Sequence, residues 1–130
     1  MSEATKSPPA AGTFCWNELM TRDVAAAKEF YTSLLGWKTE DVDIGECGIY
    51  TVLKAGEEQI GGMFQMAGEQ FEGVPANWMS YIAVDDVEAS TKKAEALGAK
   101  IEMPPADIPD TGRFSVITDP TGATIALFSR

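Results

Sequence analysis

The sequence contains no histidine, and this absence is the strongest limit on the chemistry that its side chains can perform. Without imidazole there is no Ser-His or Cys-His nucleophile pair, no histidine general base, and none of the nitrogen ligands that zinc, nickel and iron favour. The two cysteines, Cys15 and Cys47, are far apart and form no CxxC pair. No export signal is evident, so we expect both thiols to be free.

Glu18 is the carboxylate that stands out, because it interrupts an apolar strand-like run. A carboxylate in such a place either gains a hydrogen-bonding or charged partner, or loses its hydration without compensation. One interpretation makes Glu18 a general base, or an anchor for a cationic or hydroxyl-bearing ligand. The other makes it structural, hydrogen-bonded to Tyr81 or paired with Arg113. The sequence leaves both interpretations open.

The balance of charge argues against polyanionic partners. The sequence has 20 acidic and 10 basic residues, a formal net charge of −10, and this field would repel nucleic acid or an anionic membrane. No apolar run is long enough to span a bilayer. Residues 1–12 contain no apolar signal-peptide core, so we expect a disordered tail over 1–12 and a cytoplasmic location.

Two segments, residues 15–40 and 78–102, repeat the same pattern. Each has an apolar strand, an Asp-Val helix start, an Ala-rich helix, a Leu-Gly stop and a second strand. Asp23 and Asp86 mark the two helix starts, where a carboxylate can accept hydrogen bonds from free N–H groups. A repeat of this length indicates two copies of one supersecondary unit.

The ends of the two helices carry further signals. Asp85 with Glu88 also fits a capping box at the start of the second helix. Gly36 and Gly98 suit the left-handed residue that closes a helix. The helices are therefore expected between these boundaries.

Three strand-like runs follow each helix. They cover 37–42, 48–54 and 59–65 in the first copy, and 100–103, 113–118 and 124–128 in the second. Asp119-Pro120-Thr121-Gly122 is a strong turn signal between the last two. The order is β-α-β-β-β, twice. We therefore predict one α+β domain over 13–130, with module one at 13–66, a linker at 67–76 and module two at 77–130, forming a curved mixed sheet or half-barrel around a cleft.

Three motifs, in order and within a repeat, carry a family resemblance: Asp23…Phe30-Tyr31…Leu35-Gly36-Trp37, Val84-Asp85-Asp86-Val87, and Asp119-Pro120-Thr121-Gly122. Over about residues 13–128 the sequence resembles the vicinal oxygen chelate superfamily, which includes glyoxalase I, bleomycin-resistance proteins and extradiol dioxygenases. Gly112-Arg113-Phe114 is similar to a subgroup of glyoxalase-like single-domain proteins. The resemblance implies paired βαβββ modules, and homodimers are common among such proteins.

The resemblance also implies where a metal would bind. Metal-dependent members place a ligand, usually His, seven residues before the helix-start Asp; those positions hold Trp16 and Met79. A second ligand, usually Glu, comes four residues after the turn Gly; that position is Ala126, and its counterpart in module one is Ile60 or Gly62. These side chains coordinate cations poorly, so we expect no cofactor and no metal site of the family type.

A shift of two residues keeps a side chain on the same strand face and would bring in displaced ligands. It would replace Trp16 by Glu18, Met79 by Tyr81, and Ile60 by Glu58. Two carboxylates and a phenol could bind a divalent metal weakly. This remains the alternative route to a metal-dependent protein.

Alternation along the strands predicts which side chains face the cleft. Most of them are aromatic or contain sulfur, as in many small-molecule sites: Trp16, Glu18, Met20, Met63, Met79, Tyr81, Phe114, Ala126 and Phe128, with Gly62 as the opposite-parity alternative to Met63. Core filling is the competing explanation for the apolar ones. Trp78 is out of phase with Met79, so we expect it to face its helix or a dimer contact. Gly61-Gly62 lacks every other mark of a phosphate loop.

Three hypotheses follow. The first is a metal-free protein that binds a hydrophobic or aromatic small molecule in the cavity between the modules. The second is a glyoxalase-like lyase or isomerase, either cofactor-free with Glu18 as base or metal-dependent through the displaced ligands. The third is an interaction domain whose cleft is filled by its own side chains. We rank the first highest and expect a homodimer.

Overall fold

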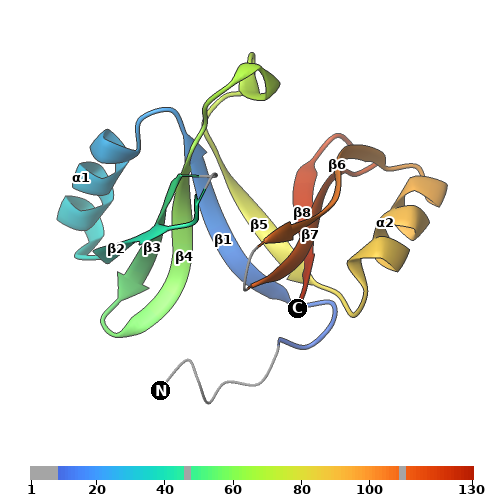
Figure 1. Ribbon diagram of the computed structural model, residues 1–130, viewed down its shortest axis with the longest axis horizontal. Coiled ribbons are helices and arrows are strands. Elements are labelled where there is room, and N and C mark those ends of the chain that lie inside the picture. Colours follow the sequence, from blue (N-terminus) through green and yellow to red (C-terminus); the bar gives the residue numbers. More distant parts are fainter. Residues whose placement is uncertain (1–8, 46–47, 109–110) are drawn as a thin grey trace. The chain divides into compact units, whose positions relative to one another are not determined.

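The computed structural model describes residues 9–45, 48–108 and 111–130 (Figure 1). These residues contain two α-helices and eight strands of mixed direction, so the α+β prediction is confirmed. They divide into two compact units. The α1 unit is Asn17–Trp78, and the α2 unit is the chain up to Trp16 together with Met79–Arg130. Most of the expected tail and Cys47 lie outside the described residues.

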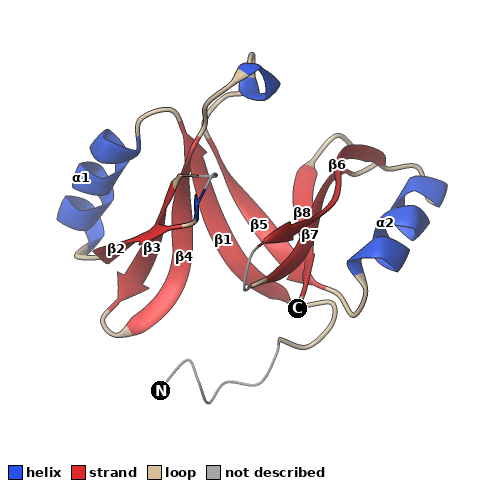
Figure 2. Cartoon of the chain, viewed as in Figure 1, coloured by secondary structure: helices blue, strands red, loops and turns tan. Residues whose placement is uncertain are grey.

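The elements follow the predicted order (Figure 2). In chain order they are β1 (Phe14–Thr21), α1 (Val24–Leu35), β2 (Lys38–Asp43), β3 (Ile49–Ala55), β4 (Glu58–Gln65), the 3-10 turn η3 (Glu69–Phe71), β5 (Asn77–Ala83), α2 (Val87–Ala96), β6 (Lys100–Ile108), β7 (Gly112–Thr118) and β8 (Thr124–Ser129).

The two modules share one pairing scheme. The strand order is β2-β3-β4-β1 in the first and β5-β8-β7-β6 in the second. In each, the first strand pairs in parallel with the last, β1 with β4 and β5 with β8, and the remaining pairs are antiparallel. This common scheme confirms the βαβββ repeat that was predicted from the sequence.

The strand β6 differs from its predicted end. The sequence indicated a strand over 100–103, yet β6 continues to Ile108 through Pro104 and Pro105. Its pairing with β7 shifts register on both sides of Met103. Because β6 is the last strand in the order, an edge strand with bulges can accommodate prolines that donate no hydrogen bond.

The two helices begin where Asp23 and Asp86 predicted them to begin, and both aspartates are N-cap residues. The Asp23 carboxylate accepts from the Ala26 N–H at 3.0 Å, and Asp86 accepts from Ala89 N–H at 3.2 Å. The expected capping box of Asp85 with Glu88 is wrong, because Asp86 is the N-cap residue. The Glu88 carboxylate instead accepts a hydrogen bond from the Arg113 guanidinium.

The Asp119 turn joins β7 to β8 as predicted. Its carboxylate accepts hydrogen bonds from the Thr121 hydroxyl and from the backbone N–H groups of Thr121 and Ala123. These bonds, that from the Thr121 hydroxyl first, lower the pKa of Asp119 below its ordinary value. The turn is therefore held by an ionised aspartate at neutral pH.

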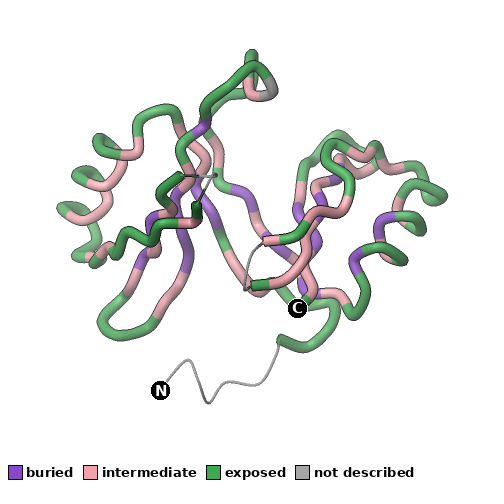
Figure 3. The backbone as a smooth tube through the Cα atoms, in the orientation of Figure 1, coloured by how far each residue is buried: buried purple, intermediate pink, exposed green. Residues whose placement is uncertain are grey.

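Each helix covers one face of its own sheet. In the α1 unit the buried core is Leu19, Leu53 and Met63, with Val24, Ala27 and Tyr31 of α1 packed against it. In the α2 unit the Thr91 hydroxyl of α2 lies 2.8 Å from that of Ser115 on β7. Figure 3 shows that α2 contributes buried residues to its unit, whereas α1 has none that is fully buried.

Trp78 contacts α1, the helix of module one, whereas one of its two expected positions was against the helix of its own module, α2. Its indole N–H donates to the Tyr31 hydroxyl at 3.2 Å, and its ring meets the rings of Tyr31 and Trp37 nearly at right angles.

Within the described residues, neither helix has both the length and the apolar character needed to cross a bilayer.

The two neighbouring aspartates at the start of α2 allow a matched test. We expect Asp86→Ala to lower the free energy of unfolding by about 1 kcal/mol, because the Ala89 N–H loses its acceptor. Asp85→Ala, which removes the same charge from the adjacent residue, should change it by less than about 0.5 kcal/mol. Urea unfolding measures both variants. A larger loss for Asp85→Ala would contradict the observed cap.

Candidate functional site

The register of β1 against β4 decides which side chains lie on the face of the sheet that α1 leaves uncovered. Glu18 is paired with Gly62, and Leu19 with Met63. Directly paired residues point to the same side of a sheet. Because Leu19 and Met63 lie in the core against α1, Glu18 and Gly62 lie on the opposite side. We call this side the open face.

Met63 therefore lies on the face opposite to the predicted one. It is fully buried in the core of the α1 unit. The alternative residue, Gly62, shares the face of Glu18. The parity of β4 was ambiguous from the sequence, because two consecutive glycines give no apolar alternation to follow.

Tyr50 completes the open face around Glu18. Gly62 pairs with Val52 on β3, and Tyr50, two residues before Val52, points to the same side. A Cβ atom at Gly62 would overlap the hydroxyl and ring of Tyr50. The missing side chain at Gly62 is what allows the Tyr50 phenol to lie flat against the strand beside Glu18.

Gly61 serves a different contact on the same strand. A Cβ there would overlap the backbone carbonyl oxygen of Asn17 on β1. The Gly61-Gly62 pair thus lies inside β4 and permits two close approaches, one of backbone and one of a phenol. It is part of a strand, in agreement with the inference that it is not a phosphate loop.

Apolar side chains continue the open face toward the end of β1. Met20 is paired with Phe64, and both have the parity of Glu18 and Gly62. The Phe64 ring lies 6.1 Å, centroid to centroid, from Phe71 of η3. The linker between the modules therefore folds back to this end of the open face.

Arg22 holds that linker in place. Its Nη1 donates to the Val74 carbonyl at 2.7 Å, and its Nη2 donates to the Phe71 carbonyl. Arg22 directly follows β1, which ends at Thr21. Sequence reasoning missed both Arg22 and Tyr50. The place of Arg22 directly after the strand of Glu18 was a visible signal, whereas Tyr50 could be placed only by the pairing of β3 with β4.

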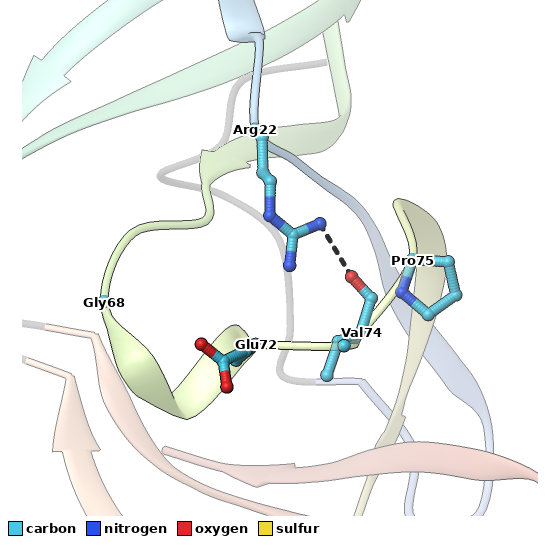
Figure 4. Close-up of a pocket in the computed structure, with 6 residues that line it drawn as sticks. Arg22, Gly68, Glu72, Val74 and Pro75 are labelled. Atoms are coloured by element: carbon cyan, nitrogen blue, oxygen red, sulfur yellow. Dashed lines mark hydrogen bonds between the residues drawn. The ribbon is translucent and has the colours of Figure 1, made fainter.

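A pocket of about 510 Å³ opens between Arg22 and the linker, and its lining consists of Arg22, Gly68, Glu72, Gly73, Val74 and Pro75. Figure 4 shows the guanidinium of Arg22 and the carboxylate of Glu72 both directed into the space that the linker encloses. Gly73 takes a left-handed backbone, with φ of 80°, which lets the chain turn back toward Arg22. The pocket thus carries one positive and one negative group.

In the α2 unit, the predicted cavity residues share one face of their sheet: Met79, Tyr81, Phe114, Ala126 and Phe128. Tyr81 pairs with Ala126, Phe114 with Phe128, and the rings of Tyr81 and Phe114 lie 6.5 Å apart. Ser115, which contacts α2, points to the other side. The predicted common face is found. That these residues contact a ligand, and that half-buried Trp16 does so, stays a prediction.

Arg113 forms ion pairs with Glu88 and with Asp107, the latter at 2.7 Å, and the structural role considered for Glu18 stays a prediction. Cys15 has a free thiol. Burial raises the pKa of that thiol above its ordinary value, which keeps it protonated and makes it a poor nucleophile at neutral pH.

The family-type metal positions hold the wrong donors. Trp16, Met79, Ala126 and Gly62 supply an indole, a thioether and no coordinating group at the last two positions. Glu58 of the displaced set begins β4 four residues before Gly62, about 13 Å along the strand from the partner of Glu18. In the part of the chain that the structure describes, no three His, Cys, Asp or Glu residues form a possible metal-binding group. The residues present do not fit a metal of the family type.

Residues 13–127 match the model of the Glyoxalase/Bleomycin resistance protein/Dioxygenase superfamily. The chain belongs to this superfamily. The chain is 44% identical over 118 residues to CFP32, a Mycobacterium bovis protein named as a candidate glyoxylase. The aligned residues cover 90% of this chain and 45% of that protein. It is 33% identical over 132 residues to the Streptomyces peucetius anthracycline biosynthesis protein DnrV, with 93% and 48% covered.

The fold of the superfamily also appears in a solved structure. Methylmalonyl-CoA epimerase from Mycobacterium tuberculosis matches with a TM-score of 0.60 and 15% identity, covering 98% of this chain and 95% of that one. At this identity the likeness concerns the fold alone. The chain spans about half the length of the two sequence relatives.

The contact between Gly62 and Tyr50 can be tested by a double-mutant cycle. We expect Gly62→Ala to lower the free energy of unfolding by about 1–3 kcal/mol, because the added methyl group displaces the Tyr50 ring. In a Tyr50→Ala background the same substitution should cost much less. Urea unfolding of the four proteins measures the coupling. Equal costs in both backgrounds would show that Tyr50 does not occupy the space above Gly62.

Proposed function

We propose that this chain binds a hydrophobic or aromatic small molecule on the open face of the α1 unit and does so without a metal ion. The observation that carries the proposal is the grouping of Glu18 with Tyr50, whose phenol occupies the space above Gly62, on the side of the sheet away from the α1 core. A site of this kind combines apolar surface with a few polar groups that orient a ligand.

The chemistry of the open face suits a flat ligand with a hydroxyl group. Met20 and Phe64 offer a polarisable thioether and an aromatic ring for apolar contact. Glu18 is only 9% exposed, so a hydrogen bond to its carboxylate forms where water competes little. The Tyr50 phenol can donate or accept.

The relatives support the aromatic character of the ligand. DnrV is named for the biosynthesis of anthracyclines, which are polycyclic aromatic compounds, and the chain is similar to nearly half of it. We extend this from the relative to the present chain as part of the proposal.

A cofactor-free lyase or isomerase is the second candidate. It is favoured by the buried position of Glu18 on the open face and by the likeness to a relative named as a candidate glyoxylase. In this function the Glu18 carboxylate would remove the proton from a hydroxyl-bearing carbon next to a carbonyl, leaving an enediolate. It would return the proton to the same carbon, or to the former carbonyl carbon while the hydroxyl proton moves to the other oxygen.

Binding can be measured with a neutral tricyclic probe, 2-(hydroxymethyl)anthraquinone, by isothermal titration and by the rise in melting temperature that a ligand of the folded state produces. We expect Glu18→Gln to weaken this probe about fivefold, because the hydrogen bond to the hydroxyl loses its charge assistance. Binding of 2-methylanthraquinone, which lacks the hydroxyl, should be unchanged.

Glu29→Gln is the matched control, because Glu29 lies exposed on α1 and the substitution removes the same charge. It should leave both affinities unchanged. If the wild-type protein binds neither anthraquinone, the proposed function is wrong. An equal loss for Glu18→Gln and Glu29→Gln would mean that Glu18 does not contact the ligand.

The second candidate has its own readout, the exchange of the α-hydrogens of 2-hydroxyacetophenone with D2O, followed by NMR. If Glu18 is a general base, the wild-type protein should accelerate the exchange, and Glu18→Gln should reduce the acceleration by at least about a hundredfold. Glu29→Gln should retain it. The same exchange rate in wild type and Glu18→Gln would remove Glu18 as the base.

A further inference from the structure

We infer that the pocket at Arg22 binds an anionic group of the ligand, so that the preferred ligand is an aromatic acid; this inference rests on the proposed function. The ring system would lie on Met20 and Phe64, and its carboxylate would lie beside the guanidinium of Arg22. This arrangement requires the pocket at Arg22 to adjoin the open face within the α1 unit.

That adjacency follows from three observed contacts. Glu18 and Met20 lie on the open face of β1, and Arg22 follows directly after this strand. Met20 is paired with Phe64, whose ring meets that of Phe71. The carbonyl of Phe71 in turn accepts from Arg22 Nη2. The open face and the Arg22 pocket therefore adjoin at Phe71, which contacts Phe64 with its ring and Arg22 with its carbonyl.

The spacing also fits one extended ligand. Glu18 and Thr21, the last residue of β1, are three positions apart, about 10 Å at the rise of a β-strand, and Arg22 follows directly. A tricyclic aromatic acid has a length of this order. Such a molecule can contact Glu18 at one end with a hydroxyl group and Arg22 at the other end with a carboxylate.

Arg22 keeps donors available for such a group. A guanidinium has five N–H donors, and the hydrogen bonds of Arg22 to Val74 and Phe71 use one on each terminal nitrogen. Those two bonds also fix the orientation of the side chain, so less conformational entropy is lost when a carboxylate binds. The orientation directs the charge into a pocket of about 510 Å³.

Glu72 makes the inference unusually easy to test, because it lines the same pocket with the opposite charge. A bound carboxylate is attracted by Arg22 and repelled by Glu72. Neutralising the two residues one at a time must therefore change the affinity for an anion in opposite directions. The affinity for a neutral molecule of the same shape should respond to neither change.

The experiment compares anthraquinone-2-carboxylate with 2-methylanthraquinone by isothermal titration at low salt. We expect the wild-type protein to prefer the carboxylate about two- to fivefold, as for a partly exposed ion pair. Arg22→Gln should abolish this preference, and Glu72→Gln should increase it by a further factor of about two. Raising NaCl to about 0.5 M should reduce the wild-type preference.

The ratio of the two affinities separates this inference from the proposed function. If Arg22→Gln loosens the linker, both affinities fall together and the ratio still reports the charge. Arg130→Gln, which removes a positive charge outside the α1 unit, should leave the ratio unchanged. If 2-methylanthraquinone binds but the ratio is the same in wild type, Arg22→Gln and Glu72→Gln, the inference is overturned while the proposed function stands. If neither anthraquinone binds, both fail.

Discussion

The parallel pairing of β1 with β4 is the constraint on which the α1 unit depends. Side chains alternate between the two faces of a sheet, so a shift of one residue in this pairing would exchange the core with the open face. The observed register places Leu19 beside Met63 against α1. The same register places Glu18 beside Gly62, and the space left free at Gly62 is taken by the Tyr50 phenol. Core and candidate site thus follow from one set of backbone hydrogen bonds.

The donor chemistry separates this chain from the metal-dependent members of its superfamily. The positions where such members carry ligands hold residues that coordinate cations poorly, and the register keeps Glu58 far from Glu18. The chain has the pairing scheme of paired βαβββ modules, and the side chains at the candidate positions on its sheets are aromatic, thioether and carboxylate groups. Such a surface can still orient an organic ligand, because shape and a few polar contacts suffice for that.

The linker contributes to the candidate site as well as connecting the modules. Arg22 donates hydrogen bonds to two of its carbonyl groups, and Phe71 meets Phe64 at the end of the open face. A segment with little secondary structure is thereby positioned by a charged side chain from the first strand. Loops held in this way commonly carry binding residues, since the scaffold fixes their backbone and leaves their side chains free to vary.

The sequence by itself determined the features that depend on neighbouring residues. Asp23 and Asp86 begin the helices, Asp119 forms its turn, and the repeated order of elements predicts two βαβββ modules, because caps, turns and periodicity are local properties. It also placed Glu18 within a strand, which is β1 in the structure. The tertiary structure alone decided that Met63 belongs to the core, that Tyr50 lies over Gly62, and that Arg22 binds the linker. Each of these depends on which distant segments of the chain meet, and local residue patterns do not encode that choice. For Met63 the two glycines before it also interrupt the alternation from which the register could have been predicted.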